Sequence, residues 1–200
     1  FVCATILTLQ ILICAPAAYA LAKLDFPGRK MFFALVLIAL LLPPEVLALP
    51  LFILGYKAGI LNTYDALVFP FVVSPFGIFL FRQFFKSIPY DVVHAARLDG
   101  LSELSIVWKI MVPMALPAIV AFSIFSVVSH WNSLFWPLIA VRSEQLLPPP
   151  VGIMAFRNEE AGSDYGPLMA ASTLVVAPLI IAFVSAQRWF VEGLTGGAVK

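Results

Sequence analysis

The chain has 200 residues, of which 62% are hydrophobic and 12% are charged, and its mean hydropathy is +1.02. Soluble domains are about half apolar and about a quarter charged, so this composition excludes an ordinary soluble domain and a disordered chain. The 12 basic residues nearly balance the 11 acidic ones, which excludes the basic surface typical of nucleic-acid binding. The composition therefore predicts a protein that resides in a lipid bilayer.

Five apolar runs are each long enough to cross about 30 Å of hydrocarbon, which takes about 20 helical residues. They predict an all-α, polytopic membrane protein that forms a single transmembrane domain over residues 1–200. The first run has no basic segment before it and no cleavage site after it, so it is interpreted as a span and not as a signal peptide. It also lacks an initiator Met, and we expect the chain to begin inside a longer protein. The predicted spans are residues 1–22, 32–56, 64–85, 114–141 and 167–190.

The second run contains Pro43, Pro44 and Pro50, which remove backbone donors and are expected to kink or locally unwind the helix. Glu45 is the best candidate for an ionisable side chain inside the bilayer, where such groups are costly and usually functional. In a straight helix it would lie about 20 Å along the axis from Phe32, beyond the midplane toward the outside. Two interpretations stay open: a carboxylate satisfied by freed backbone donors or water, and a carboxylate on a translocation path.

Basic residues distribute unequally between the two sets of loops that five alternating crossings would create. By the positive-inside rule, the richer set faces the cytoplasm. This places the loop of residues 87–113 and the C-terminus in the cytoplasm and the N-terminus outside. The nine basic residues on the cytoplasmic side are Lys23, Arg29, Lys30, Arg82, Lys86, Arg97, Lys109, Arg188 and Lys200. The three on the other side are Lys57, Arg142 and Arg157.

The loop of residues 87–113 predicts two short helices at the membrane surface. Gly100 is suited to the left-handed residue that ends the first helix, and Ser102 is a plausible N-cap for the second, with Glu103 near its positive end. An interfacial helix that only covers lipid headgroups is the alternative. An apolar stripe is expected along the second helix: Leu101, Leu104, Val107, Trp108 and Met111.

The same loop resembles the signature E-A-A-x3-G-x9-I-x-L-P of the membrane subunits of binding-protein-dependent ABC importers. Five of its seven specified positions match as they stand, while His94 replaces the usual Glu and Val112 replaces Leu. The flanking segments resemble the carbohydrate-importing branch of that family, which takes up sugars and glycerol phosphate. The matching positions are Ala95, Ala96, Gly100, Ile110 and Pro113, and the flanking segments are residues 61–64, 74–80, 82–89, 130–132, 135–138, 150–152 and 187–200.

The resemblance implies a permease subunit, usually with six spans, of which the first is missing here. It implies that the loop docks in a cleft of an ATP-hydrolysing subunit and transmits its movement to the membrane helices. It further implies a second permease subunit, two ATP-binding subunits and an extracytoplasmic solute-binding protein around a bacterial inner-membrane complex. The docking residues that it implies are His94, Ala95, Ala96, Asp99, Gly100, Ile110 and Pro113. With His94, an imidazole takes the place of the fixed anion.

Trp131 and Asn132 are candidate residues of the solute path, because Asn can hydrogen-bond hydroxyl groups and a Trp face can stack on a sugar ring. The alternatives are that Trp131 belongs to an interfacial aromatic belt and that Asn132 bonds a neighbouring helix. The following residue, often acidic in the family, is Ser133 here.

The sequence contains no G-x-x-x-x-G-K-[ST] motif, so ATP would be bound by partner subunits and not by this chain. No catalytic set and no metal-ligand cluster is apparent, and no cofactor is expected. The prediction is a non-enzymatic permease of an ATP-driven importer. An ion-coupled secondary transporter that uses Glu45 is the alternative.

Overall fold

A computed structural model describes residues 1–156 and 165–195, with the side chains of residues 1–154 and 165–184. Every regular element in these ranges is helical, which confirms the all-α prediction. Arg157 and Lys200, two of the residues used to predict orientation, lie outside the described residues.

Twelve α-helices and five shorter helical segments follow one another along the described chain. The α-helices are α1 (Val2–Lys23), α2 (Arg29–Leu41), α3 (Ala48–Lys57), α4 (Tyr64–Val68), α5 (Pro75–Ser87), α6 (Tyr90–Leu98), α7 (Glu103–Ile106), α8 (Val112–Met114), α9 (Leu116–Trp131), α10 (Phe135–Ala140), α11 (Pro149–Gly152) and α12 (Tyr165–Thr195). The shorter segments are 3-10 helices η1 (Pro44–Leu47), η2 (Phe69–Phe71), η4 (Glu144–Leu146) and η5 (Ile153–Phe156), and one π-helix, η3 (Val107–Met111).

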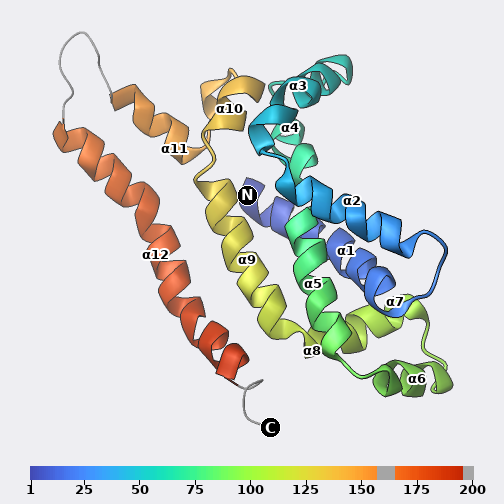
Figure 1. Cartoon of the computed structure of the whole chain (residues 1–200). Coiled ribbons are helices and arrows are strands. Elements are labelled where there is room, and N and C mark those ends of the chain that lie inside the picture. Colours follow the sequence, from blue (N-terminus) through green and yellow to red (C-terminus); the bar gives the residue numbers. More distant parts are fainter. Residues whose placement is uncertain (157–164, 196–200) are drawn as a thin grey trace.

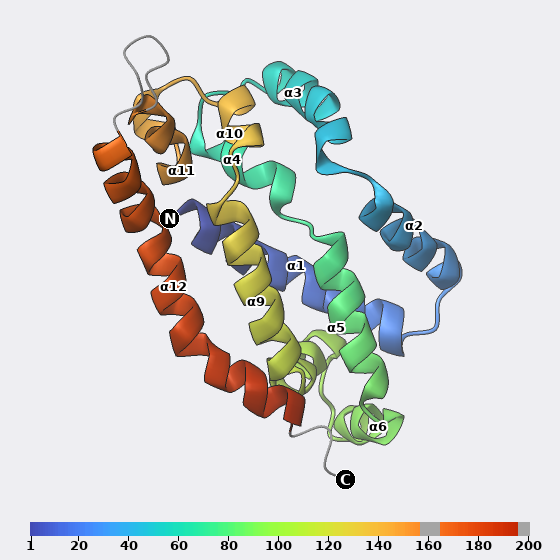
Figure 2. The ribbon, with the colours of Figure 1, turned by 60° about the vertical axis from the view of Figure 1, so that its left-hand side comes forward.

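The long helices α5, α9 and α12 run along the length of the molecule, and α1 crosses them obliquely (Figures 1 and 2). Helix α1 packs mainly on α5 and also on α9, while α12 packs on α9. One end of the bundle carries α3, α4 and α10, and the opposite end carries α6 and the last turns of α12 (Figures 1 and 2). The loop of residues 87–113 and the end of α12 thus lie at the same end of the bundle.

Two helical segments of the described chain, Val2–Lys23 and Tyr165–Val184, are each long and apolar enough to cross a bilayer. Up to three further crossings come from pairs of helices that are bent where they join. The pairs are Arg29–Leu41 with Pro44–Lys57, bent by 101°, Tyr64–Phe71 with Pro75–Ser87, bent by 41°, and Glu103–Met114 with Leu116–Trp131, bent by 83°. Length and composition therefore allow two to five spans.

The sharpest bend falls at Pro43 and Pro44, where the sequence predicts a kink. Leu42 adopts an extended conformation, as the residue before a proline prefers, and this ends α2. Pro50 lies in the first turn of α3, where a missing N–H costs nothing, so the helix continues through it. The depth of Glu45 in the bilayer stays a prediction, but the straight helix on which it was based is bent by 101°.

The predicted run of residues 114–141 is also divided, because α9 ends at Trp131 and α10 begins only at Phe135. Asn132 caps the end of α9, and its side-chain amide donates a hydrogen bond to the carbonyl of Val128 at 2.9 Å. The backbone N–H of Asn132 donates to the same carbonyl at 3.1 Å, so two donors of Asn132 close the last turn of α9. Helix α9 alone is therefore shorter than the predicted span.

The main hydrophobic core lies between α1, α5 and α9 and extends into the loop of residues 87–113. Phe122 of α9 sits edge-on against Phe81 of α5, with ring centroids 5.1 Å apart. A Cβ atom placed on Gly77 would lie 2.9 Å from the Phe122 ring and 3.4 Å from Cys14 Sγ. Gly77 therefore allows the close approach of α5 to both neighbouring helices.

We expect Gly77→Ala to lower the thermal unfolding midpoint of the detergent-solubilised protein. The added methyl group displaces a buried ring, and overpacking of this kind costs about 1–3 kcal/mol. Gly152→Ala is the matched control, because a Cβ atom there meets nothing within 4 Å. Equal midpoints for the two variants would contradict the packing described.

Candidate functional site

The turn between α6 and α7 is built around Gly100, which has a φ of 78°. The N–H of Leu101 donates to the carbonyl of Ala96 at 3.1 Å, and the N–H of Gly100 donates to the carbonyl of Arg97 at 3.0 Å. These two bonds form a Schellman motif, which satisfies the last carbonyls of a helix and favours glycine in the left-handed position. The prediction that Gly100 is the left-handed residue that ends this helix is confirmed.

Helix α7 starts as the sequence predicts. Ser102 is its N-cap, and the Ser102 hydroxyl accepts a hydrogen bond from the N–H of Ser105 at 3.4 Å. Glu103 occupies the first turn, where a negative charge interacts favourably with the helix dipole.

The predicted apolar stripe of the second helix is only partly correct. Val107 and Met111 are buried, but Leu104 is 63% exposed and Ile106, absent from the predicted stripe, is fully buried. The reason is that residues 107–111 form a π-helix, whose wider turn changes which side chains share a face. The remaining members, Leu101 and Trp108, are half-buried against the core.

A carboxylate joins the loop to the C-terminal part of α1. The Tyr19 hydroxyl donates to Glu103 Oε2 at 2.5 Å, and Arg97 Nε donates to Glu103 Oε1 at 2.8 Å. These hydrogen bonds, that from Arg97 first, lower the pKa of Glu103, so it carries its charge at neutral pH. One side chain of α7 thereby links α1 and α6.

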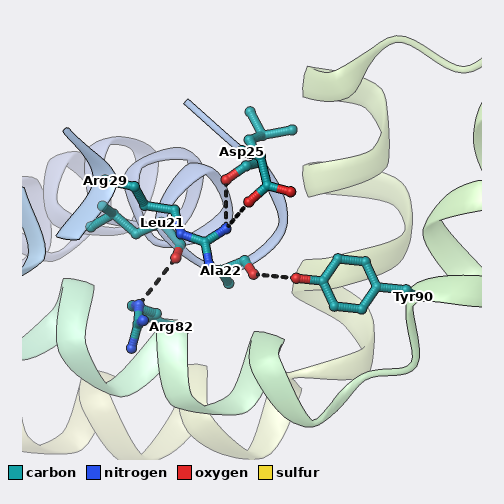
Figure 3. A network of polar contacts seen from close by, with 7 residues as sticks. Leu21, Ala22, Asp25, Arg29, Arg82 and Tyr90 are labelled. Atoms are coloured by element: carbon teal, nitrogen blue, oxygen red, sulfur yellow. Dashed lines mark hydrogen bonds and ion pairs between the residues drawn. The ribbon is translucent and has the colours of Figure 1, made fainter. Parts of the chain in front are cut away.

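Side chains from α5 and α6 donate hydrogen bonds to carbonyls in the last turn of α1 that have no backbone partner (Figure 3). Arg82 Nε of α5 donates to the carbonyl of Leu21 at 3.1 Å, and the Tyr90 hydroxyl of α6 donates to the carbonyl of Ala22 at 3.0 Å. The final carbonyls of a helix have no intrahelical partner, and a cation is favoured near them. The end of α1 is thus fastened to both α5 and α6.

Two further basic residues lie at this end of α1. Lys23 is buried, donates to the carbonyl of Ile88 and lies 4.1 Å from the centroid of the Tyr90 ring. Arg29 donates to the carbonyl of Leu24 at 2.8 Å and to Asp25 at 2.7 Å (Figure 3). Tyr19, Lys23, Arg82, Tyr90, Arg97 and Glu103 are called the anchor cluster below.

The predicted docking residues of α6 and its C-terminal turn lie on two different faces. Ala96 is buried with Val93 in the core, so its small side chain serves internal packing. The outward-facing residues are His94, Ala95, Asp99 and Gly100, together with Leu98, which is 89% exposed. Of the two residues near α8, Ile110 is half-buried and Pro113 is exposed.

Sequence reasoning missed the anchor cluster as a unit. Its members come from the first span, the third span and the loop, and only the folded chain brings them together. The available signal was that Tyr19 and Lys23 stand one helical turn apart at the end of an apolar run, which places them on the same side of that helix.

The three candidate path residues make different contacts. Trp131 Nε1 donates to the carbonyl of Val175 in α12 at 3.1 Å, and Asn132 bonds back to its own helix. Among the described residues, the Asn132 side chain has no hydrogen bond to a neighbouring helix, which was the alternative interpretation of this residue. Glu45 is exposed on η1, at the bend between α2 and α3.

Comparison with known proteins identifies the class to which this fold and loop belong. The family model of the binding-protein-dependent transport system inner membrane component matches residues 12–196. A crystal structure of a bacterial ABC transporter involved in the import of the acidic polysaccharide alginate has the same fold. Its TM-score is 0.81 at 24% identity, over 94% of this chain and 71% of the other.

Two permeases illustrate the relationship at the level of sequence. The chain is 40% identical over 195 residues to the arabinooligosaccharides transport system permease protein AraQ of Halalkalibacterium halodurans, over 98% of this chain and 70% of the relative. It is 31% identical over 179 residues to the sn-glycerol-3-phosphate transport system permease protein UgpE of Yersinia pestis, over 89% of this chain and 64% of the relative. The chain thus spans about two thirds of the length of these relatives.

The chain belongs to the family of binding-protein-dependent transport system inner membrane components. It is a multi-pass permease component, which takes part in transport and not in catalysis, and the resemblance found in the sequence is confirmed. Membership implies that it works with a binding protein and an ATPase.

We expect Tyr19→Phe to loosen α7 from α1, because the Glu103 carboxylate loses one of its two partners. Hydrogen exchange of the amides of residues 104–106 should accelerate about three- to tenfold, which is the change in the opening equilibrium expected when one hydrogen bond is lost. Tyr56→Phe is the control, since Tyr56 is exposed and its hydroxyl has no partner among the described residues. Unchanged exchange in Tyr19→Phe would show that the anchor cluster does not hold the loop.

Proposed function

We propose that the outward face of α6 and its C-terminal turn docks on an ATP-hydrolysing subunit and transmits its movement to the spans. The observation that carries this proposal is the pairing of an exposed face with a firmly attached inner face. On the inner face, Val93 and Ala96 pack in the core. The exposed residues on the outward face are His94, Ala95, Leu98, Asp99 and Gly100.

Movement applied to that outward face reaches three membrane helices through identified contacts. The anchor cluster joins α6 and α7 to the end of α1 and joins α1 to α5. The π-helix η3 leads through Pro113 into α9, across a bend of 83°. Because α1, α5 and α9 share one packed core, displacement of the loop would shift them together.

The complete transporter in this proposal contains a second permease, two ATP-binding subunits and an extracytoplasmic solute-binding protein. The two permeases enclose a solute path, so this chain provides half of its wall. The docking loop and the C-terminus face the cytoplasm, as the distribution of basic residues indicates. The position of α6 and the last turns of α12 at one end of the bundle supports this orientation (Figure 1).

The transported solute in this proposal is a carbohydrate or a glycerol phosphate, as the names of the relatives indicate. Glu45 and Asn132 are exposed and can face the path, and Trp131 contributes to its wall where α9 meets α12. Ion-coupled transport through Glu45 is not favoured, because the family and its relatives are permeases of ABC importers.

Gly100→Asp should weaken docking about tenfold or more while leaving the loop folded. Aspartate is one of the few residues tolerated at positive φ, and open space surrounds Gly100, so the new charge projects from the docking face. Co-purification of the ATPase subunit and ATP-driven uptake should each fall about tenfold or more, equivalent to at least about 1.4 kcal/mol of docking free energy.

Gly59→Asp provides the matched control for this experiment. Gly59 also has a positive φ, 68°, and open space around it, but it follows α3 at the opposite end of the bundle. The Gly59→Asp variant should retain uptake and ATPase binding. Normal ATP-driven uptake by Gly100→Asp would refute the docking proposal.

Glu45→Gln should leave ATP-driven uptake within about twofold of the original rate, since the exposed amide keeps its shape and polarity. Uptake would be measured in proteoliposomes with ATP inside, and again with a proton gradient and no ATP. Proton-driven uptake that disappears in Glu45→Gln would instead establish the ion-coupled mechanism.

A further inference from the structure

A cavity of about 180 Å³ with several polar side chains in its wall lies between α1, the η2–α5 segment and α9, apart from the loop of residues 87–113. Gln10, near the middle of the α1 span, contributes to its wall, so the cavity reaches into the bilayer. Polar side chains at such depth are costly and usually functional. Six of its lining residues carry the argument: Gln10, Phe71, Phe125, Ser126, Ser129 and His130.

The inner wall of the cavity is a hydrogen-bonded network whose members are already satisfied. Gln10 Nε2 donates to the carbonyl of Phe71 at 2.8 Å, and the Ser126 hydroxyl donates to Gln10 Oε1 at 2.6 Å. Gln10 is only 3% exposed and Ser126 only 4%. The network therefore holds α1, η2 and α9 in register and gives the cavity a defined polar wall.

His130 presents a hydrogen-bond acceptor beside this wall. Its Nδ1 lies 2.7 Å from the carbonyl oxygen of Ser126, which can only accept, so Nδ1 carries the proton. In the neutral ring, Nε2 is then an acceptor, and it has no hydrogen-bond partner among the described residues. The ring is held edge-on against Phe71, with centroids 5.1 Å apart, so its orientation is defined.

Ser129 adds a second unused polar group. It is exposed, it lines the cavity, and within the described part of the chain its hydroxyl has no hydrogen-bond partner. Phe125, four residues earlier on α9, is 57% exposed and offers an aromatic face at the same opening. The opening thus combines a hydroxyl, an imidazole acceptor and an aromatic ring.

These groups match the surface of a neutral sugar. Hydroxyl groups of a sugar can donate to His130 Nε2 and exchange hydrogen bonds with Ser129, and its C–H face can pack on Phe125. None of the described residues that line the cavity is charged, so nothing there compensates a phosphate or carboxylate group.

We propose that this cavity is a contact site for a neutral carbohydrate during its passage through the transporter. The proposal rests on the proposed function, whose path it makes specific. It moves the principal solute contact from Trp131 and Asn132, which bond α12 and the α9 backbone, to Ser129 and His130.

The test uses the transporter reassembled in proteoliposomes from this chain, its companion permease, its ATPase and its binding protein. Uptake of arabinotriose and of sn-glycerol-3-phosphate is measured alongside ATP turnover stimulated by the binding protein. Ser129→Ala and His130→Phe remove the two unused groups while leaving the Gln10–Ser126 hydrogen bond intact. Ser123→Ala is the matched control, because Ser123 belongs to the same helix but faces an apolar pocket beside α12.

Each cavity variant should lower arabinotriose uptake about three- to tenfold, which is the change expected when one neutral hydrogen bond is lost. ATP turnover should stay within about twofold of that of the unmodified complex. Ser123→Ala should transport normally. Uptake of arabinotriose at the original rate by both cavity variants would overturn the proposal, and so would transport of sn-glycerol-3-phosphate in preference to arabinotriose. Absence of ATP-dependent uptake of either solute by the unmodified complex would instead refute the proposed function.

Discussion

The last turn of α1 is the point on which the rest of the structure depends. A helix that ends near a membrane surface leaves carbonyl groups without backbone partners, and unpaired polar groups are costly there. This chain pairs the carbonyls of Leu21 and Ala22 with Arg82 and Tyr90, which come from α5 and α6. A local requirement of one helix end thereby determines where α5 and the loop of residues 87–113 attach.

In the mechanism that we propose, that attachment lets the loop of residues 87–113 act on the membrane helices. The inner face of the loop belongs to the core of α1, α5 and α9, and close-packed interiors transmit displacement. Its outer face, with Leu98 almost fully exposed, is available to a partner. The loop is therefore coupled to the spans by packing as well as by polar contacts.

Polar residues within the spans follow a second pattern. Gln10 and Ser126 satisfy each other and join helices, as polar groups in a bilayer are expected to do. His130 and Ser129 instead keep polar atoms that the described chain does not pair. The contrast separates groups that maintain the fold from groups that the proposed contact site would use.

The sequence by itself determined the all-α membrane class, the loop motif, the Gly100 turn, the Ser102 cap and the proline bend, because each depends on composition or neighbouring residues. The π-helix, the break after Trp131, the anchor cluster and the cavity between α1, α5 and α9 were decided only by tertiary structure. Tyr19 and Glu103 are 84 residues apart and Gln10 and Ser126 are 116 apart, so no local pattern relates them. Ala96 shows the difference within one motif. The sequence identified it as a motif residue, but only the packing decided that its side chain faces the core.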